Sequence, residues 1–290
     1  MRVLPFKIPK PEQGALVFQV DNSDTFYDKF HQHEEIQISF IVEGEGTLVV
    51  GNSINHYSKG DIIIIGSFLP HVLKSDTKTS KISHMLTLFF TKSDFGNQFF
   101  DLEELKELAS FFKRAKHGFK VTSNLKLIEK LFFKLEKASK LNRFLILLQL
   151  LKITSKATYK SLSTFIYDKK YTDNEGYRMR NVFEFTMNNF EKEITLEEIA
   201  EVANMTKNAF CKYFKKRTNK TYFQFLNELR IENACKLLLS NKDLSIIQIA
   251  EASGFNNMSN FNRQFKSIKK KKPSEFKKVH SIALKAIFFQ

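Results

Sequence analysis

Three histidines and two further polar residues near the amino terminus have the types and spacing to bind a ligand. His31, His33, Glu35 and Gln37 occupy alternate positions of one run, so in an extended strand all four side chains point to the same face. His71 follows a turn-rich segment further along the chain. Imidazole and carboxylate groups gathered on one face bind polar molecules or transition-metal ions. We interpret these five residues as a ligand pocket.

A second set of chemically informative residues lies in an internal repeat near the carboxyl terminus. Residues 199–215 and 249–266 resemble each other if the second copy carries one extra residue in its turn. Each copy predicts a helix containing Ile-Ala, a short turn, an N-cap (Thr206 in the first, Asn256 or Asn257 in the second) and a second helix ending in Phe-Lys. This order is that of a helix-turn-helix unit.

One face of each second helix has the residues to contact DNA. Asn208, Cys211 and Lys212 are spaced i, i+3 and i+4, and so are Ser259, Asn262 and Arg263. Arginine pairs with guanine and asparagine with adenine in a major groove, while helix N-termini and lysines bind phosphates. The predicted DNA-binding residues are Thr206, Lys207, Asn208, Cys211, Lys212, Lys215, Asn257, Ser259, Asn262, Arg263 and Lys266. The lysine run 269–272 is either a further phosphate contact or a solvated surface.

Aromatic pairs and a connecting helix are expected to hold these two faces in place. Phe210 with Phe214, and Phe261 with Phe265, are four residues apart and should anchor each second helix in its own core. The helix expected over 225–240 would be about 24 Å long. With a little of each flanking unit it would separate the two recognition helices by about 34 Å, one turn of B-DNA.

Composition and charge agree with a nucleic-acid partner. The chain has 290 residues, with 46 Lys and Arg against 31 Asp and Glu, a formal net charge of +15. Such an excess favours a polyanion, with nucleic acid ahead of anionic lipid. Two cysteines exclude a disulfide scaffold and a four-cysteine zinc module. The amino terminus lacks the apolar core of a signal peptide, and 144–151 is too short to span a bilayer, so we expect a cytoplasmic protein without membrane contact.

The patterns along the chain predict an α+β protein. Short β-branched and aromatic runs up to about residue 90 predict an antiparallel β-barrel, and leucines at helical spacing follow it. We expect a barrel over 1–100, a helical segment over 101–165, a linker over 166–180 and an all-α domain over 181–290. The two helix-turn-helix units are expected at about 195–218 and 245–268.

The carboxyl-terminal pattern resembles the AraC/XylS family of bacterial transcription regulators. The resemblance spans roughly 181–280, and the matches in order include Ile249-Ala250, Gly254-Phe255, Phe265-Lys266 and Pro273-Ser274-Glu275-Phe276. It implies promoter DNA as the partner, a homodimer and a small-molecule effector, with RNA polymerase as a further candidate partner. It also implies a bacterial protein that is associated with the nucleoid through DNA. The family usually has glycine shortly after each Phe-Lys, where this chain has Asn219 and Lys270. Because lysine tolerates a left-handed backbone poorly, we expect the end of the second recognition helix to be shaped differently.

The amino-terminal pattern resembles a cupin over about residues 15–90. In cupins a His-x-His, a carboxylate and a later histidine surround the cavity, and the metal-binding carboxylate lies four residues after the second histidine. That position is Gln37 here, a poor ligand for a hard metal. We therefore predict an organic effector and no cofactor or metal, with His31, His33 and His71 as the residues that would hold zinc or iron. The alternative is that these three histidines bind no ligand and are structural residues, hydrogen-bonded inside or at the mouth of the barrel.

Three function classes remain open from the residues. The first is a non-enzymatic, sequence-specific transcription regulator with a dimerising helical segment, whose leucines are Leu127-Leu131-Leu135 and Leu141-Leu145-Leu148. Packing within one chain would explain the same leucines without a dimer. The second class is a metal-dependent cupin enzyme fused to a DNA-binding module. The third is a basic protein that coats DNA or membrane without specificity, which the two unlike recognition helices disfavour.

Overall fold

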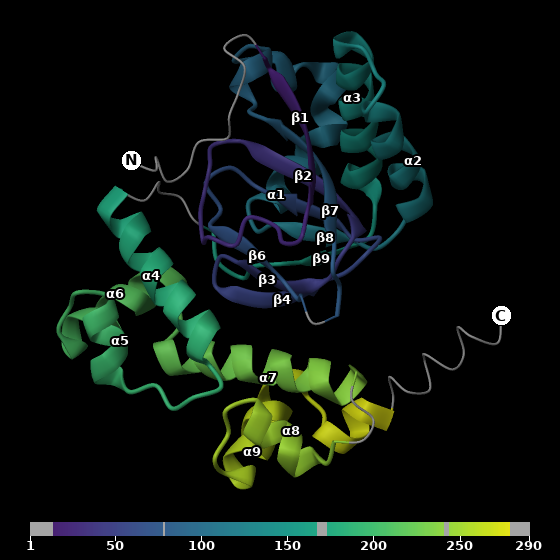
Figure 1. The fold of residues 1–290 in the computed structure, drawn as a ribbon. Coiled ribbons are helices and arrows are strands. Elements are labelled where there is room, and N and C mark those ends of the chain that lie inside the picture. Colours follow the sequence, from purple (N-terminus) through teal and green to yellow (C-terminus); the bar gives the residue numbers. More distant parts are fainter. Residues whose placement is uncertain (1–13, 78, 167–172, 241–243, 279–290) are drawn as a thin grey trace. The chain divides into compact units, whose positions relative to one another are not determined.

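The computed structural model describes residues 14–77, 79–166, 173–240 and 244–278, and its contacts divide the chain into two compact units (Figure 1). The units are Met1–Arg180 and Asn181–Gln290. Among the described residues, no helix combines the length and apolarity needed to cross a membrane. The two units are described one after the other.

The first unit is built on two antiparallel sheets. A six-stranded sheet has the order β1-β7-β2-β5-β8-β9, and a three-stranded sheet has the order β4-β3-β6. The strands are β1 (Leu16–Ser23), β2 (Ile36–Glu43), β3 (Gly46–Val50), β4 (Ser53–Tyr57), β5 (Ile62–Ile65), β6 (His71–Ser75), β7 (Ser83–Phe90), β8 (Phe119–Val121) and β9 (Tyr159–Ser161). The antiparallel, sheet-rich amino-terminal region predicted from the short apolar runs is confirmed.

Alternation along the strands separates two hydrophobic cores. On β2, Ile38 and Phe40 face helices that cover the six-stranded sheet, while Ile41 faces the space between the two sheets. The second core also includes Ile63 from the large sheet and Leu48 from the small one. Because both faces of β5 are covered, its four residues form a continuous apolar run.

Helices and two short strands follow β7. The helical elements are η1 (Ser93–Phe95), η2 (Phe99–Asp101), η3 (Glu103–Leu108), α1 (Ala109–Ala115), α2 (Leu125–Leu135) and α3 (Lys140–Lys156). The strands β8 and β9 lie within the segment predicted as helical and extend the six-stranded sheet beyond β5. Three-residue strands carry too little periodicity to be recognised in a sequence.

The leucine stripes of this segment are only partly buried. Leu131 and Leu135 of α2 are in the core, whereas Leu127 is 50% exposed. On α3 the core face consists of Ile146, Leu147, Leu150 and Leu151, while Leu141 and Leu145 are 68% and 47% exposed. Packing within one chain therefore accounts for part of the two stripes and leaves Leu127, Leu141 and Leu145 at the surface.

Part of the predicted linker is helical. Helix α4 (Asp173–Asn189) begins inside the segment 166–180, and 167–172 lie outside the described residues. The polar Asp-Asn-Glu-Gly sequence at 173–176 suggested a loop, but polar residues are also typical of a helix N-terminus, where aspartate and asparagine cap the helix.

The described residues of the second unit are helical. After α4 come α5 (Leu196–Val202), α6 (Lys207–Thr218), α7 (Tyr222–Ser240), α8 (Ile246–Ala252) and α9 (Met258–Lys269). Helix α7 has 19 residues, which makes it about 28 Å long and three residues longer than its predicted counterpart. The two ends of α7 pack into two different hydrophobic cores. Phe225 packs with Phe214 of α6, and Ala234 and Leu238 pack with α8 and α9.

Candidate DNA interface and effector site

Local sequence signals begin each helix of the two helix-turn-helix units. Thr195 caps α5 by accepting a hydrogen bond from the Glu198 backbone N–H (3.2 Å). Ser245 caps α8 in a reciprocal capping box with Gln248. Thr206 and Asn257 cap α6 and α9, so the second recognition helix begins after Asn257 rather than after Asn256.

The turns of the two units have the same backbone hydrogen bond and differ only after it, where the second copy has one extra residue. The backbone N–H of Met205 donates to the Ala200 carbonyl (2.9 Å), and Phe255 donates in the same way to Ala250 (3.0 Å). The residue before each donor, Asn204 or Gly254, has a positive φ. The extra residue therefore lies between Phe255 and the N-cap Asn257.

Buried phenylalanines orient the two recognition helices. Phe210, Phe214, Phe261 and Phe265 are each fully buried, and the rings of each pair contact each other at centroid distances of 5.7 and 5.6 Å. The opposite faces are left to solvent. All of the residues predicted to bind DNA are exposed: Thr206, Lys207, Asn208, Cys211, Lys212, Lys215, Asn257, Ser259, Asn262, Arg263 and Lys266.

Some of these side chains already have partners within the chain. Lys207 forms an ion pair with Glu197, and the Arg263 guanidinium donates to the Asn260 side-chain oxygen (3.0 Å). Lys269, from the lysine run, forms an ion pair with Glu232 and is mostly buried. For Lys269 the pairing favours a structural role over a phosphate contact.

A groove of about 590 Å³ runs beside the second recognition helix. It is lined by Asn262, Arg263 and Lys266 of α9 and by Lys272 and Ser274 that follow the helix, together with Ile246, Met258 and Pro273. Cationic and amide groups along one groove suit the phosphates and base edges of nucleic acid. No sequence pattern indicated this groove. One wall is a face of α9 and the other is the segment 272–274, which follows the helix and does not continue its periodicity.

Arg230 joins the two helix-turn-helix units. Its guanidinium, on α7, donates to the backbone carbonyls of Phe190 (2.8 Å) and Lys192 (2.7 Å), which follow α4. The same guanidinium lies against Gly254 in the turn of the second unit, where a Cβ would come within 2.8 Å of Arg230 Nε and 2.5 Å of the Phe190 oxygen. The turn and the chain after α4 therefore approach so closely that only glycine fits.

The two recognition helices end in the same way. Asn219 and Lys270 both adopt a left-handed conformation at the C-cap, with φ of 55° and 59°, and each donates its N–H to the carbonyl four residues earlier. The expectation that the second helix ends differently is wrong. Lysine takes the strained conformation, which carries a penalty of about 1–2 kcal/mol for a residue with a Cβ.

The histidines of the first unit converge, but they do not share one regular strand. Strand β2 begins at Ile36, so Gln37 lies in a strand while His33 and Glu35 precede it. His31 forms an isolated antiparallel bridge with His71, the first residue of β6. The ring centroids lie 4.2 Å apart for His31 and His71 and 5.0 Å apart for His33 and His71.

Burial lowers the pKa of two of these histidines, His31 and His71. His33 and His71 are 2% and 1% exposed, and His31 is partly exposed. Desolvation, followed by the neighbouring His33, lowers the pKa of His31 to about 3. Desolvation also lowers the pKa of His71 well below its usual value. Both rings are therefore neutral at physiological pH, the form in which imidazole binds metals.

The cluster fits a metal ion by position. One nitrogen from each of His31, His33 and His71 lies within 4.8 Å of the other two. Three nitrogens on one tetrahedral zinc ion are roughly 3.3 Å apart, so the rings would have to move closer together to share an ion. Glu35 places its carboxylate 3.6 Å from Nδ1 of His33.

A row of buried polar side chains leads away from the cluster. Gln37 Oε1 lies 3.3 Å from Nε2 of His33, its amide donates to Ser39 (2.8 Å), and Ser39 contacts Thr87 (2.9 Å). These contacts join four polar groups inside the apolar space between strands. Buried polar groups usually occur in such connected networks.

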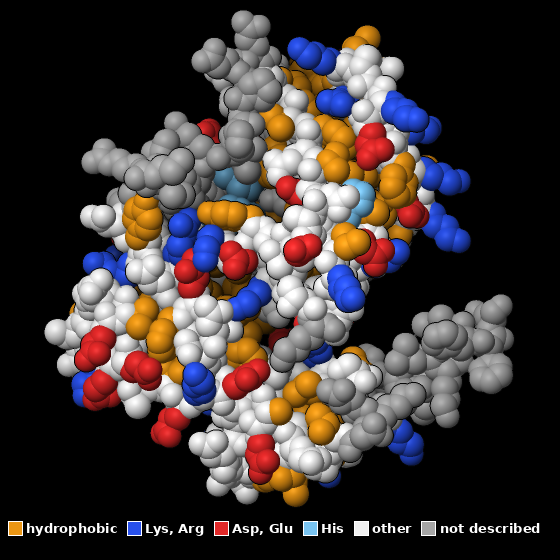
Figure 2. All heavy atoms as spheres, viewed as in Figure 1, with side chains coloured by type: hydrophobic (Ala, Val, Ile, Leu, Met, Phe, Trp, Pro, Cys, Tyr) orange, Lys and Arg blue, Asp and Glu red, His pale blue; other side chains and the backbone are white. Residues whose placement is uncertain are grey.

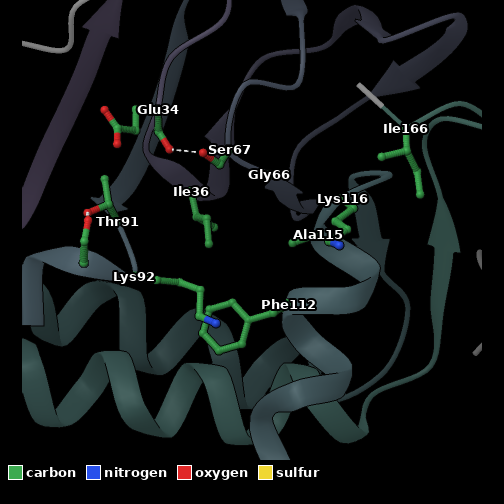
Figure 3. A pocket seen from close by; sticks show the side chains of 11 residues that line it. Glu34, Ile36, Gly66, Ser67, Thr91, Lys92, Phe112, Ala115, Lys116 and Ile166 are labelled. Atoms are coloured by element: carbon green, nitrogen blue, oxygen red, sulfur yellow. Dashed lines mark hydrogen bonds between the residues drawn. The ribbon is translucent and has the colours of Figure 1, made fainter. Parts of the chain in front are cut away.

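A separate cavity of about 360 Å³ lies beside Ile36, the first residue of β2 (Figure 3). Its walls include Ile36, Phe112 and Ile166, and Lys92 extends over the Phe112 ring with its amine 4.8 Å from the centroid. Lys116 and the hydroxyl-bearing Ser67, Thr91 and Ser93 also line it. The size suits a small organic molecule. Because these residues come from five distant segments, no spacing in the sequence indicated them.

Comparison with known proteins identifies both halves of the chain. A helix-turn-helix domain family matches residues 199–278, and a cupin domain family matches residues 14–86. An uncharacterised HTH-type transcriptional regulator of Bacillus subtilis, YdeC, is 23% identical over 262 residues, 88% of each chain. The Msm operon regulatory protein of Streptococcus mutans is 22% identical over 245 residues, 83% of each chain.

A solved structure with a similar span is ToxT from Vibrio cholerae, which is 16% identical with a TM-score of 0.36 and is covered to 97%, over 91% of this chain. The domain matches and the full-length relatives agree with the tandem helix-turn-helix units and the sheet-rich first unit described above. The chain is an AraC-type DNA-binding transcription regulator with an amino-terminal cupin domain.

Proposed function

We propose that this regulator reads two successive major grooves of promoter DNA with helices α6 and α9. The observation that carries the proposal is that both helices bury a phenylalanine pair and expose an equivalent polar face, while one helix, α7, packs against both units. The positive charge is concentrated accordingly, since residues 175–290 hold 21 Lys and Arg against 12 Asp and Glu.

Each exposed residue type has a distinct role in this proposal. Arg263 reads guanine, and Asn208 or Asn262 reads adenine. The exposed Lys212, Lys215 and Lys266 bind phosphates, and the N-termini capped by Thr206 and Asn257 do the same. Lys207, Cys211 and Ser259 supply further contacts at the start of each helix.

The amino-terminal domain is proposed to sense a small-molecule effector. His31, His33, Glu35, Gln37 and His71 form the proposed site, supported by their burial and by the polar row that continues from Gln37. Effector occupancy would change how the DNA-binding domains are presented to the promoter.

A homodimer is the proposed assembly. Its support is the group of large apolar side chains that α2 and α3 leave exposed, namely Leu125, Leu127, Phe133, Leu141 and Leu145. Figure 2 shows hydrophobic side chains at the surface over these helices, with lysine and arginine along their outer edge. An apolar patch rimmed by charge is typical of a protein interface. RNA polymerase is a further proposed partner, and the cytoplasm is the proposed location because the DNA is there.

Catalysis is not part of the proposed function. The relatives that match over most of the chain are transcriptional regulators, which supports a non-enzymatic role. The competing candidate is a metal-dependent cupin enzyme fused to a DNA-binding module, for which the histidine cluster is the specific observation. Turnover that depends on His31, His33 and His71 would establish that alternative.

Selection of bound DNA from a random duplex pool at near-physiological salt tests the regulator. The full-length protein should enrich a motif with two contacted segments about one helical turn apart. Binding that is indifferent to sequence, with and without cell extract as a source of effector, would contradict the proposal.

A further inference from the structure

The cavity beside Ile36 shares no residue with the proposed effector site. Its volume is about 360 Å³, near the lower end of the range for small-molecule sites. Ile36 belongs to the core between the six-stranded sheet and the helices, whereas Gln37, the next residue of the strand, points to the other face and joins the polar row. The cavity and the histidine cluster are therefore two separate sites.

Close backbone packing shapes one wall of this cavity. Gly66 directly follows β5, and a Cβ at this position would come within 2.1 Å of the Ala115 carbonyl oxygen. The end of α1 therefore lies directly on the end of β5, with no room for a side chain between them. The Ser67 hydroxyl donates to the Glu34 carbonyl, which ties this wall to the segment before β2. Contacts within the chain thus form the cavity without a ligand.

Apolar side chains make up another part of the lining. Ile36 and Ala115 belong to the buried core, and Phe112 is partly buried against the same core. Ile166 adds an exposed apolar side chain from the far end of the first unit. A predominantly apolar surface with a few polar groups is typical of cavities that bind small organic molecules.

Two lysines give the cavity a positive charge. Lys92 and Lys116 are exposed, and within the described ranges neither forms an ion pair. The Lys92 ammonium lies 4.8 Å from the centroid of the Phe112 ring, and a ring face attracts a cation more weakly than a carboxylate does. Glu34 is the one acidic residue among the described residues of the lining, and Figure 3 shows its carboxylate on the side of Thr91, away from Lys116.

We propose that this cavity binds a small monocarboxylate. The apolar body of the ligand packs against Ile36, Phe112 and Ile166, and its carboxylate pairs with Lys92 and Lys116. A dianion such as phosphate is less suited, because Glu34 offsets one of the two lysine charges. The inference goes beyond the proposed function, since it gives the sensing domain a second ligand site.

Titration of the full-length protein with phenylacetate, followed by ligand-observed NMR, tests the site. Phenylacetate combines one carboxylate with a compact apolar ring, and phenylacetamide is its neutral analogue of nearly the same shape. We expect saturable phenylacetate binding with a dissociation constant of about 1 mM or lower. Phenylacetamide should bind at least about tenfold more weakly, because it cannot form charge-assisted hydrogen bonds with the lysines.

Paired lysine substitutions locate the binding. Lys92→Gln combined with Lys116→Gln should weaken phenylacetate binding at least about tenfold and leave phenylacetamide binding nearly unchanged. Lys113→Gln combined with Lys126→Gln is the matched control, because it removes the same charge from exposed lysines of α1 and α2 that do not line the cavity. All four substitutions are at exposed positions, so both double variants should melt at the temperature of the unaltered protein.

Four results would overturn the monocarboxylate site. They are the absence of saturable phenylacetate binding up to about 10 mM, equal affinities for the acid and the amide, equal weakening by the two double variants, and weakening by His71→Gln in place of the cavity variant. The last result would assign the carboxylate to the histidine cluster. Stronger binding of the acid that is lost only in the Lys92 and Lys116 variant supports the proposal.

Discussion

Arg263 is the side chain of the second recognition helix with the strongest capacity to read a base. It is exposed in the middle of α9, and its guanidinium donates a hydrogen bond to the side-chain oxygen of Asn260. We expect Arg263→Ala to reduce the binding free energy on the selected site by about 1–3 kcal/mol and to relax base preference at one position. Binding titrations on the selected site and on single-base variants measure both effects.

Lys215 provides the matched comparison for Arg263. It is exposed in the last turn of α6, where a lysine contacts phosphate rather than bases. Lys215→Ala should weaken binding to all sequences alike and reduce the slope of log affinity against log salt by about 0.9. If Arg263→Ala weakened random DNA as much as the selected site, its proposed base-reading role would be wrong.

At the scale of the helix, Lys270 shows how the second recognition helix ends. Its left-handed backbone strains a residue that has a Cβ, whereas glycine adopts it freely. Lys270→Gly should raise the free energy of unfolding of the DNA-binding domain by about 1 kcal/mol. Lys271→Gly removes the same charge one residue later, where the structure has no positive φ, and should not stabilise. Equal effects of the two substitutions in thermal denaturation would rule out this C-cap explanation.

The contact between the two helix-turn-helix units depends on Gly254. Gly254→Ala places a Cβ against the backbone oxygen of Phe190 and the side chain of Arg230, so the turn must move. We expect weaker binding to the two-segment site, with a smaller loss on a single segment, together with a lower melting temperature. The measurement is binding to duplexes that carry both segments or one.

Gly60 offers a control for the conformational part of this effect. The φ of Gly60 is +87°, close to the +82° of Gly254, but a Cβ on Gly60 would meet nothing within 4 Å. Gly60→Ala should therefore cause only the strain of the left-handed backbone, about 1–2 kcal/mol, and should leave DNA binding unchanged. If Gly254→Ala were no more harmful than Gly60→Ala, the close approach at Arg230 would not set the spacing of the units.

For the whole molecule, the exposed apolar side chains of α3 test the proposed dimer. Leu141 and Leu145 are 68% and 47% exposed, so replacing both with lysine should leave the folded chain intact. The double variant should shift sedimentation from dimer to monomer at micromolar concentration, because two charges would be buried in the interface. Leu102→Lys, at a residue that is 48% exposed outside α2 and α3, is the control. A monomeric unaltered protein, or a double variant that remains dimeric, would contradict the proposed surface.

The sequence by itself determined the helix-turn-helix units and the sheet-rich first domain. Caps at Thr206 and Asn257, the Phe-x-x-x-Phe pairs and the i, i+3, i+4 polar trios are local signals, read within one or two helical turns. Because these interactions depend only on neighbouring residues, the exposed face of each recognition helix could be named without a structure. The short apolar runs predicted most strands up to β7 for the same reason.

Only the tertiary structure decided which distant residues meet. The Arg230–Phe190 contact joins residues 40 positions apart, the His31–His71 bridge depends on strand register, and the 360 Å³ cavity draws on five segments. Strands β8 and β9 exist because the edge of β5 is available for pairing, and their own residues carry little strand pattern. Long-range pairing and packing are set by the whole fold, whereas caps and periodicity are set by the local chain.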